Sequence, residues 1–191
     1  MVHQTSGTNP VIPLANAGHG NFSRSRSKVV ELIWIISEYL LVSNPLQLSS
    51  RIRVLTLRSF GANIGKGVLI RPRVRVKFPW NLEIGDNCWI GEGVWIHNQV
   101  PVVIESDVAV SQETFITTGS HDFRKSMDLV VMPIMIRSGA WITSRCMILQ
   151  GVDIGQNALV VPASVVKYSL DANGVYAGNP AVRIGNRFGP S

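Results

Sequence analysis

The chain has 191 residues and a net charge of +6, from 18 Lys and Arg against 12 Asp and Glu. Its length fits one domain with short appendages, and 46% hydrophobic against 16% charged residues exclude an intrinsically disordered chain. The basic balance favours an anionic partner, but no nucleic-acid recognition motif accompanies the charge, so we do not expect nucleic acid. The two cysteines, Cys88 and Cys146, form no metal or disulfide pattern, so we expect a reducing, cytoplasmic compartment.

The N-terminal part divides into a tail and a helical segment. Residues 1–27 are rich in Gly, Ser, Asn and Thr and lack an apolar core, which predicts a flexible tail rather than a secretory signal. Residues 28–58 form the helical segment, and within it residues 29–42 (VVELIWIISEYLLV) are the most apolar window. This window is too short to span a bilayer, and Glu31 and Glu38 interrupt it. We expect a helix packed on the end of the domain.

From residue 64 onward, an aliphatic residue returns every six positions. The positions fall into triplets separated by two-residue insertions and one longer gap, and all of them are Ile or Val: Ile64, Ile70, Val76, Ile84, Ile90, Ile96, Ile104, Val110, Ile116, Ile136, Ile142, Ile148, Ile154, Val160 and Val166. A helix repeats near 3.6 residues and cannot give a period of six. Short strands interrupted by corners can, and three of them make one coil of about 18 residues. Residues 59–170 are therefore predicted to be an all-β parallel β-helix, followed by a C-terminal extension over residues 171–191.

A second column of small or β-branched residues lies four positions after the aliphatic one, with Trp80 as the exception. We expect this column to face inward as well, which gives Cys88 and Cys146 a structural role. Glycine directly follows the aliphatic residue at Gly65, Gly85, Gly91 and Gly155. We expect these glycines to supply the backbone conformations that corners need.

Basic residues form two groups. Arg24, Arg26 and Lys28 precede the apolar window and favour the alternative for that window, an interfacial helix in peripheral contact with the inner face of the membrane. The second group alternates along the first coil, at Arg71, Arg73, Arg75 and Lys77, and alternation predicts that all four share one outward face. That face is either simply solvated or contacts an anionic glycan, a lipid-linked sugar phosphate or an acidic headgroup.

The long gap in the repeat lies between Ile116 and Ile136, and repeat proteins carry function on such insertions. We expect residues 122–135 to leave the coil as a loop. His121 sits where the coil opens into this loop, and an imidazole with a pKa of about 6.5 can take a proton at cytoplasmic pH. His121 is therefore the candidate general base, and Asp122 is a candidate for orienting its ring.

Several stretches from about residue 60 to 185 resemble the sugar O-acetyltransferase branch of the hexapeptide-repeat acyltransferases. They are Thr118-Gly119-Ser120-His121-Asp122, the WIGEGVW of Trp89 to Trp95, Trp141-Ile142, and the YAGNPA of Tyr176 to Ala181. The chain is similar above all to the putative colanic acid biosynthesis acetyltransferase family. This resemblance, and not the periodicity, implies that the β-helix is left-handed.

The resemblance also implies a function and a set of site residues. It implies acetyl-coenzyme A as co-substrate, a sugar hydroxyl as acceptor in polysaccharide or glycoconjugate biosynthesis, His121 as base and no required metal. It places acceptor-binding groups at His97, Asn98 and Gln99, although the family often has an acidic residue where this chain has His97. It places cofactor-binding groups at Ser144, Pro162, Ala163, Lys167 and Arg183. It further implies a homotrimer with the active site between two subunits.

The sequence is also compatible with four other functions. An amino-sugar N-acetyltransferase would use the same donor, and serine is a third conceivable acceptor. A metal-dependent hydrolase like the γ-class carbonic anhydrases would need three histidines around zinc, but only His97 and His121 lie on the coils. A non-catalytic β-helix that binds or scaffolds would keep the fold without the chemistry.

Overall fold

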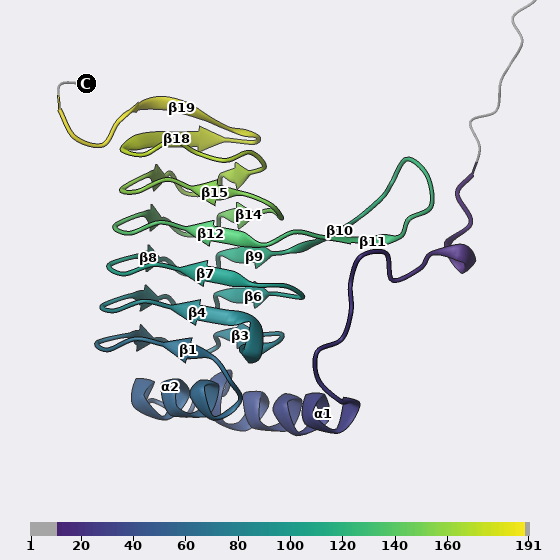
Figure 1. The fold of residues 1–191 in the computed structure, drawn as a ribbon. Helices are drawn as coiled ribbons and strands as arrows, with labels where there is room; N and C mark the ends of the chain where they lie inside the picture. Colours follow the sequence, from purple (N-terminus) through teal and green to yellow (C-terminus); the bar gives the residue numbers. More distant parts are fainter. Residues whose placement is uncertain (1–10, 190–191) are drawn as a thin grey trace, which may run out of the picture.

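The structure is a computed structural model that describes residues 11–189, so residues 1–10 of the predicted tail lie outside the described part. Two helices lie across one end of a parallel β-solenoid, and a β-hairpin lies at the other end (Figure 1). The helical elements, in chain order, are the 3-10 turn η1 (Leu14–Asn16), α1 (Lys28–Ser37), the π-helical turn η2 (Glu38–Val42), α2 (Ser50–Ser59) and the 3-10 turn η3 (Pro79–Asn81).

The solenoid has three faces, each of them a sheet of short parallel strands. The β1 face contains β1 (Asn63–Ile64), β4 (Leu82–Ile84), β7 (Val102–Ile104), β12 (Ile134–Ile136) and β15 (Asp153–Ile154). The β2 face contains β2 (Leu69–Ile70), β5 (Trp89–Ile90), β8 (Ala109–Val110), β13 (Trp141–Ile142), β16 (Leu159–Val160), β18 (Gly174–Gly178) and the antiparallel β19 (Ala181–Asn186). The β3 face contains β3 (Arg75–Val76), β6 (Trp95–His97), β9 (Phe115–Thr117), β14 (Met147–Ile148) and β17 (Val165–Val166).

The six-residue period places one aliphatic side chain per strand inside the prism. On the β1 face, for example, Ile64 pairs with Ile84, which pairs with Ile104. Every one of the fifteen predicted Ile and Val positions is 5% exposed or less. Burying these columns removes apolar surface from water at about 25 cal/mol per Å², which is the main force that stacks the coils. The predicted parallel β-helix of hexapeptide repeats is confirmed.

The second inward column is also buried over most of its length. Cys88 and Cys146 are fully buried and unpaired, as expected for structural residues. Burial raises the pKa of the Cys88 thiol, which keeps it protonated. Thr114 is fully buried too, and its hydroxyl donates to the carbonyl oxygen of Thr143 at 2.9 Å on the next coil. The buried hydroxyl of Thr114 thereby has a hydrogen-bond partner, as does that of Ser164, which donates to the carbonyl oxygen of Val161 at 2.7 Å.

The glycines after the aliphatic residues have a different role from the one predicted. None of Gly65, Gly85, Gly91 and Gly155 has a positive φ. Instead, a Cβ added at Gly85 would lie 2.6 Å from the backbone nitrogen of Ser106, and one at Gly155 would lie 2.5 Å from that of Ala172. The next coil thus occupies the space that a side chain would need. The positive φ falls three residues after the aliphatic position, for example at Asn87 and Ala163.

The N-terminal segment forms two helices rather than one, because the chain turns through Pro45 between η2 and α2. Trp34 of α1 is buried, and its indole nitrogen donates to the carbonyl oxygen of Val76 at 2.9 Å. Arg53 of α2 is fully buried, and within residues 11–189 it forms no ion pair with a carboxylate. Its guanidinium donates to the carbonyl oxygens of Val42, Gln47 and Ile70 and so ties both helices to the first coil. The predicted packing of a helix on the domain end is confirmed.

The predicted loop over residues 122–135 is largely a β-hairpin arm. β10 (Gly119–His121) pairs with the antiparallel β11 (Leu129–Val131), and β12 rejoins the solenoid at Ile134 (Figure 1). Pairing satisfies the backbone groups that an open loop would leave to water. The described part of the predicted tail runs beside this arm, because Leu129 donates its backbone N–H to the carbonyl oxygen of Gly18 at 3.1 Å. The tail is therefore in contact with the arm over this stretch rather than free.

The basic residues of the first coil do not share one face, because a corner at residues 71–74 separates them. Arg71 lines a groove on the β2 face, and Arg73 has a positive φ and pairs with Glu92 at 3.6 Å. Arg75 and Lys77 lie on the β3 side of the corner, where the Arg75 guanidinium stacks 4.0 Å from the centre of the Trp95 ring. The predicted alternation fails because the strands are only two residues long.

The close approach of successive coils yields a stability prediction. Gly85→Ala should destabilise the protein by about 1–3 kcal/mol, because the new methyl group has to push the next coil away. Gly185→Ala is the matched control, since nothing lies within 4 Å of the Cβ it would add. Thermal unfolding followed by circular dichroism measures both. Equal midpoints for the two variants would contradict the close-approach role of Gly85.

Candidate active site

His121 lies at the end of β10, on the arm, with an exposed side chain. Its ring atom Nδ1 lies 2.8 Å from the carbonyl oxygen of Met127. A carbonyl only accepts, so Nδ1 carries the proton when the ring is neutral, and Nε2 has a free lone pair. The arrangement fixes the tautomer that a general base needs. Met127 reaches this position because it has a positive φ at the turn of the arm, where its backbone N–H donates to the carbonyl oxygen of Asp122 at 2.9 Å.

Asp122 does not orient the His121 ring. Its carboxylate oxygen Oδ1 accepts from the backbone N–H of Arg124 at 3.2 Å, which caps the turn of the arm. Within residues 11–189, no hydrogen bond joins the side chains of Asp122 and His121. The orienting group is a main-chain carbonyl, and sequence reasoning missed it because every residue type carries one.

His97 lies at the end of β6, with its ring Nδ1 3.4 Å from the hydroxyl oxygen of Thr117. Burial lowers the pKa of His97 below its ordinary value, and the nearby Lys77 ammonium lowers it further. The neutral form of the His97 imidazole is therefore favoured near pH 7. Together with Gln99, it lines a cavity of about 500 Å³ between α1, the described tail and the β3 face. Leu129, which lies opposite His121 in the arm, also lines this cavity.

Of the three predicted acceptor-binding residues, Asn98 has no free polar group. It is fully buried, and its amide nitrogen donates to the carbonyl oxygens of Phe78 and Asn81, at 2.7 and 3.0 Å. Its amide oxygen accepts from the backbone N–H of Phe78 at 3.0 Å. These contacts hold the corner after β3, so the geometry corrects Asn98 to a supporting residue. Gln99 is nearly buried, and its Oε1 accepts from the hydroxyl of Thr118 at 3.2 Å.

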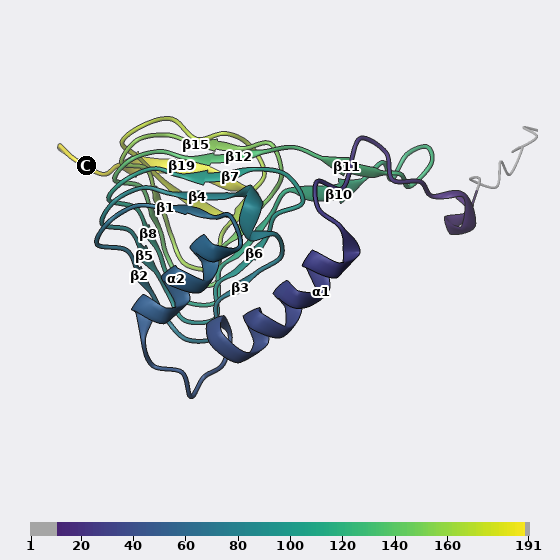
Figure 2. The same ribbon diagram turned by 60° about the horizontal axis from the view of Figure 1, so that its bottom comes forward.

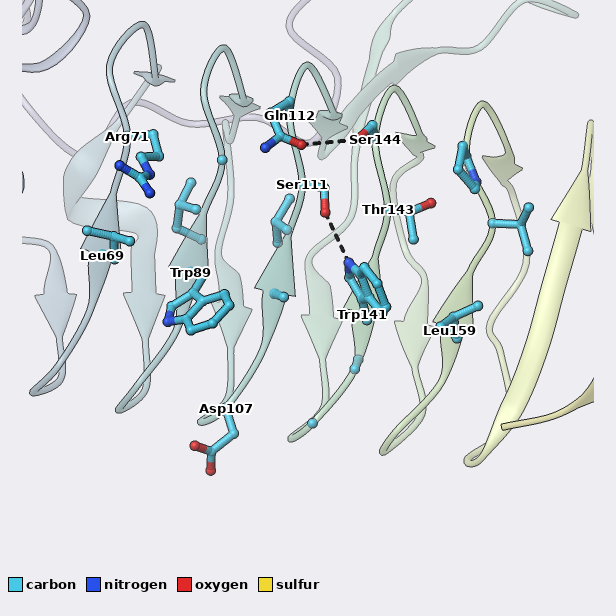
Figure 3. A pocket seen from close by; sticks show the side chains of 18 of the residues that line it. Leu69, Arg71, Trp89, Asp107, Ser111, Gln112, Trp141, Thr143, Ser144 and Leu159 are labelled. Carbon is cyan, nitrogen blue, oxygen red and sulfur yellow. Dashed lines mark hydrogen bonds between the residues drawn. The ribbon is translucent and has the colours of Figure 1, made fainter. Parts of the chain in front are cut away.

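A groove of about 830 Å³ runs along the β2 face and its edge with the β3 face (Figure 3). Trp89 and Trp141 project into it from the two coils on either side of Ala109, and the indole nitrogen of Trp141 donates to the hydroxyl oxygen of Ser111 at 3.0 Å. Ser144 lies at the edge, where its hydroxyl donates to the side-chain oxygen of Gln112 at 3.1 Å (Figure 3). The groove combines an apolar floor with polar groups at its rim, as ligand sites commonly do.

The structure brings together three of the five predicted cofactor-binding residues. Ser144 and Pro162 line the groove, and Ala163 joins them in a smaller adjoining hollow. Lys167 and Arg183 line neither. Arg183 is instead held by Asn186 at 2.6 Å and by Asp171 at 3.7 Å.

Two basic residues that sequence reasoning did not select line the groove, namely Arg71 and Arg187. From the sequence, Arg71 is noted only as one of the four alternating basic residues of the first coil. The Arg187 guanidinium donates to the carbonyl oxygens of Gly139 and Asn157, at 2.6 and 3.2 Å, across two coils. This contact cannot be predicted from the spacing of residues in the sequence, because it forms only when the C-terminal hairpin folds back over the solenoid.

A single chain does not bring His121 to the groove. The arm leaves the solenoid between β9 on the β3 face and β12 on the β1 face. The groove follows the β2 face and the edge that this face shares with the β3 face. These are different edges of the prism, and His121 lines none of the described cavities. Within one chain, the His121 imidazole and this groove therefore lie at different edges of the solenoid.

The described residues contain no group of three or more His, Cys, Asp and Glu side chains placed to hold a metal ion. His97 and His121 thus gain no third ligand, and the zinc-hydrolase alternative gains no support. Among residues 11–189, no helix has the length and apolarity needed to cross a bilayer.

Comparisons with known proteins identify relatives over most of the chain. No protein-family model matches. The chain is 37% identical, over 83% of its length and 87% of the relative's, to "Putative colanic acid biosynthesis acetyltransferase WcaF" of Escherichia coli. It is 29% identical to the galactoside O-acetyltransferase of Escherichia coli, over 65% of this chain and 63% of that protein.

Solved structures agree with this assignment at the level of the fold. A hexapeptide-repeat acetyltransferase from Vibrio cholerae, complexed with acetyl-coenzyme A, matches with a TM-score of 0.77 at 24% identity, over 92% of this chain and 98% of that one. A galactoside acetyltransferase in complex with coenzyme A matches with a TM-score of 0.76 at 21% identity, over 88% of each chain. The identity to WcaF, over most of both chains, shows that this chain belongs to the hexapeptide-repeat acetyltransferases.

Proposed function

We propose that this protein transfers an acetyl group from acetyl-coenzyme A to a sugar hydroxyl in polysaccharide or glycoconjugate biosynthesis, with His121 as general base. The observation that carries the proposal is the hydrogen bond from His121 Nδ1 to the carbonyl oxygen of Met127. It leaves Nε2 unprotonated and accessible on an exposed arm. The WcaF relative, named for colanic acid biosynthesis, supports the polysaccharide assignment, and the galactoside O-acetyltransferase supports a sugar hydroxyl.

The chemistry needs one base and no covalent enzyme intermediate. His121 Nε2 takes the proton of the acceptor hydroxyl while that oxygen attacks the thioester carbonyl. The C–S bond then breaks, and the departing coenzyme A thiolate receives the proton from the imidazolium. Proton transfer of this kind contributes about 10²–10⁴-fold to the rate. The Met127 carbonyl assists because it stabilises the Nδ1–H of the imidazolium that forms.

The cavity beside His97 is the proposed acceptor pocket. Its walls combine aromatic surface, from Trp95 and Phe78, with the cationic groups of Arg75 and Lys77. Aromatic rings stack on the apolar faces of sugars, and the two cations favour an acceptor that bears a negative charge. Neutral His97 and the amide of Gln99 are suited to hydrogen bonding with hydroxyl groups.

The groove on the β2 face is the proposed binding site for the donor. Its apolar floor suits the pantetheine chain, and Ser144, Pro162 and Ala163 border the edge along which the chain would lie. Arg71 and Arg187 supply positive charge for the phosphates of coenzyme A. Lys167 and Arg183 lie outside the groove of their own chain, and in this proposal they contact the phosphates that extend beyond it.

The distribution of apolar surface supports a homotrimer. The outward residues of the β2 face are apolar in register, from Leu69 through Trp89 to Trp141, and Trp89 is 65% exposed. The outward row of the β3 face includes Trp95 and Phe115. The β1 face is more polar, and at its edge Arg137 pairs with Asp153 and Glu105. Its outward row consists of Asn63, Glu83, Val103, Met135 and Asp153. The remaining outward positions of the β2 and β3 rows are Ala109, Leu159, Val175, Arg75, Met147 and Val165.

Two adjoining faces that are mainly apolar and one that is more polar are the pattern expected of a subunit that packs around a threefold axis. In such a trimer, the arm of one subunit would bring His121 to the groove of its neighbour. A cytoplasmic location fits the two buried, unpaired cysteines and the supply of acetyl-coenzyme A.

The direct test of the function is an acetyl-transfer assay against a panel of sugars, sugar phosphates and nucleotide sugars, with release of free coenzyme A as readout. We predict transfer to a sugar hydroxyl, so that hydroxylamine removes the acetyl group from the product as it does from an ester. A product that resists hydroxylamine would be an amide and would indicate an amino-sugar N-acetyltransferase. No transfer to any acceptor, together with no coenzyme A binding in calorimetry, would indicate a non-catalytic binding protein.

His121→Ala should lower kcat by about 10²–10⁴-fold, because the acceptor hydroxyl loses its base. Asp122→Asn is the matched control, since its side chain only caps a turn, and should lower kcat by less than about fivefold. Steady-state kinetics on the best acceptor from the panel measure both. A loss of less than about fivefold in His121→Ala would remove this residue from the mechanism.

The shared site predicts complementation between two inactive variants. One carries His121→Ala, and the other carries Ser144→Arg, which fills the groove. In randomly mixed trimers, about one site in four combines an intact His121 with an intact neighbouring groove, so mixing after unfolding and refolding should restore about a quarter of the wild-type activity. Sedimentation velocity should show a trimer. An active monomer, or no recovery on mixing, would contradict the shared site.

A further inference from the structure

The helix formed by α1 and η2 is apolar on both sides. Its inner side is buried at Trp34 and Val42, against the first coil. Its outer side carries eight large apolar residues with exposures from 40 to 73%. Two leucines of the following segment are more than 80% exposed, and two apolar residues of α2 are 43 and 52% exposed. We call these twelve residues the cap face: Val29, Leu32, Ile33, Ile35, Ile36, Tyr39, Leu40, Leu41, Leu46, Leu48, Ile52 and Leu55.

The cap face exposes a large apolar surface, and contact of such a surface with water is unfavourable. A helix that is hydrophobic all round normally has a partner on each side. Large contiguous exposed apolar patches mark interaction surfaces. The helix is nevertheless too short to cross a bilayer, and none of the described helices can do so.

The charge around the cap face is net positive. Residues 11–60 contain six Arg and Lys residues but only two carboxylates, Glu31 and Glu38. Glu31 is compensated by Arg24 at 3.0 Å, and the half-buried Glu38 accepts from the backbone N–H of Val76 at 2.6 Å. Apart from Arg24, the exposed cationic residues are Arg26, Lys28, Arg51 and Arg58. A basic border around an apolar face is complementary to a membrane surface of anionic lipid.

The position of the cap face also suits a flat surface. α1 and α2 lie across the end of the solenoid, so their outer sides face away from the rest of the fold (Figure 2). In the proposed homotrimer, a threefold axis along the solenoids would turn all three cap faces toward one plane. Three weakly inserting faces on one assembly bind a surface far more tightly than one, because the second and third contacts are intramolecular.

We propose that the cap face lies on an anionic phospholipid bilayer as a monotopic anchor, with the aliphatic side chains of α1 and η2 inserted between the headgroups. The acceptor pocket lies directly beside this anchor, because Trp34, Ile35 and Glu38 line the same cavity as His97. An acceptor held at the membrane surface would therefore reach the pocket laterally, along α1. The anchoring does not depend on the proposed reaction, so each can fail without the other.

Vesicle co-sedimentation tests this proposal. The full chain is spun with vesicles of phosphatidylcholine alone and with vesicles that also contain phosphatidylglycerol. We expect binding to the anionic vesicles that weakens as salt is raised, because ions screen the basic border. Ile33→Gln with Ile36→Gln should weaken binding at least about tenfold, since two inserted side chains are lost. Val182→Gln with Ile184→Gln, on the exposed β19 hairpin at the other end of the solenoid, is the matched control and should bind like the wild type.

Several results would overturn the proposal. One is that the wild-type protein stays in the supernatant with both kinds of vesicle, and another is that it binds both kinds equally. A third is that the two double variants weaken binding by the same factor. A wild-type assembly larger than a trimer without lipid, which the Ile33→Gln and Ile36→Gln changes reduce to a trimer, would instead assign the cap face to contact between copies. Acetyl transfer to a soluble acceptor should be unchanged in the cap-face variant. That readout shows that the variant is folded and separates the anchor from the catalytic proposal.

Discussion

Successive coils of this protein are joined by backbone hydrogen bonds. The distance between neighbouring strands that these bonds set governs the rest of the structure. At that separation, each aliphatic side chain stacks on the equivalent side chain of the next coil, and the core becomes a continuous column. The same spacing leaves no space for a Cβ at positions such as Gly85 and Gly155. It also limits where the chain can depart from the coil. Extra residues fit only at a corner, where they can project outward without separating the strands.

The arm that carries His121 is such an outward insertion, and its rigidity comes from pairing within itself and with the described tail. The imidazole is held by a carbonyl of the same arm, so its tautomer is set independently of the solenoid. The arm's own edge of the prism, however, borders the cavity beside His97 and not the groove that Ser144 and Pro162 line. The catalytic proposal therefore depends on assembly, and the apolar β2 and β3 faces provide the surfaces for it.

The sequence was sufficient to predict the fold and the place of the arm, because the repeat and its interruption can be read from single residues. The inward positions from Ile64 to Val166 are all Ile or Val and recur every six residues within each group. They do so because each of them packs on the equivalent side chain of the next coil. Features that depend on backbone groups or on contacts distant in sequence could not be predicted this way. The Met127 carbonyl, the carbonyl ligands of buried Arg53 and the place of Arg187 in the groove are examples. Asn98 was selected by position in the family, but its amide is fully used by the neighbouring corner.

The proposed reaction requires that an imidazole from one subunit meets a thioester held by the next. A crystal structure of the protein with coenzyme A bound tests it most directly. We expect coenzyme A to lie along Ser144 and Pro162, with its sulfur within about 3–3.5 Å of Nε2 of the neighbouring subunit's His121, which is close enough for direct proton transfer. A sulfur located far from every His121, or coenzyme A bound on a face without Trp89 and Trp141, would contradict it.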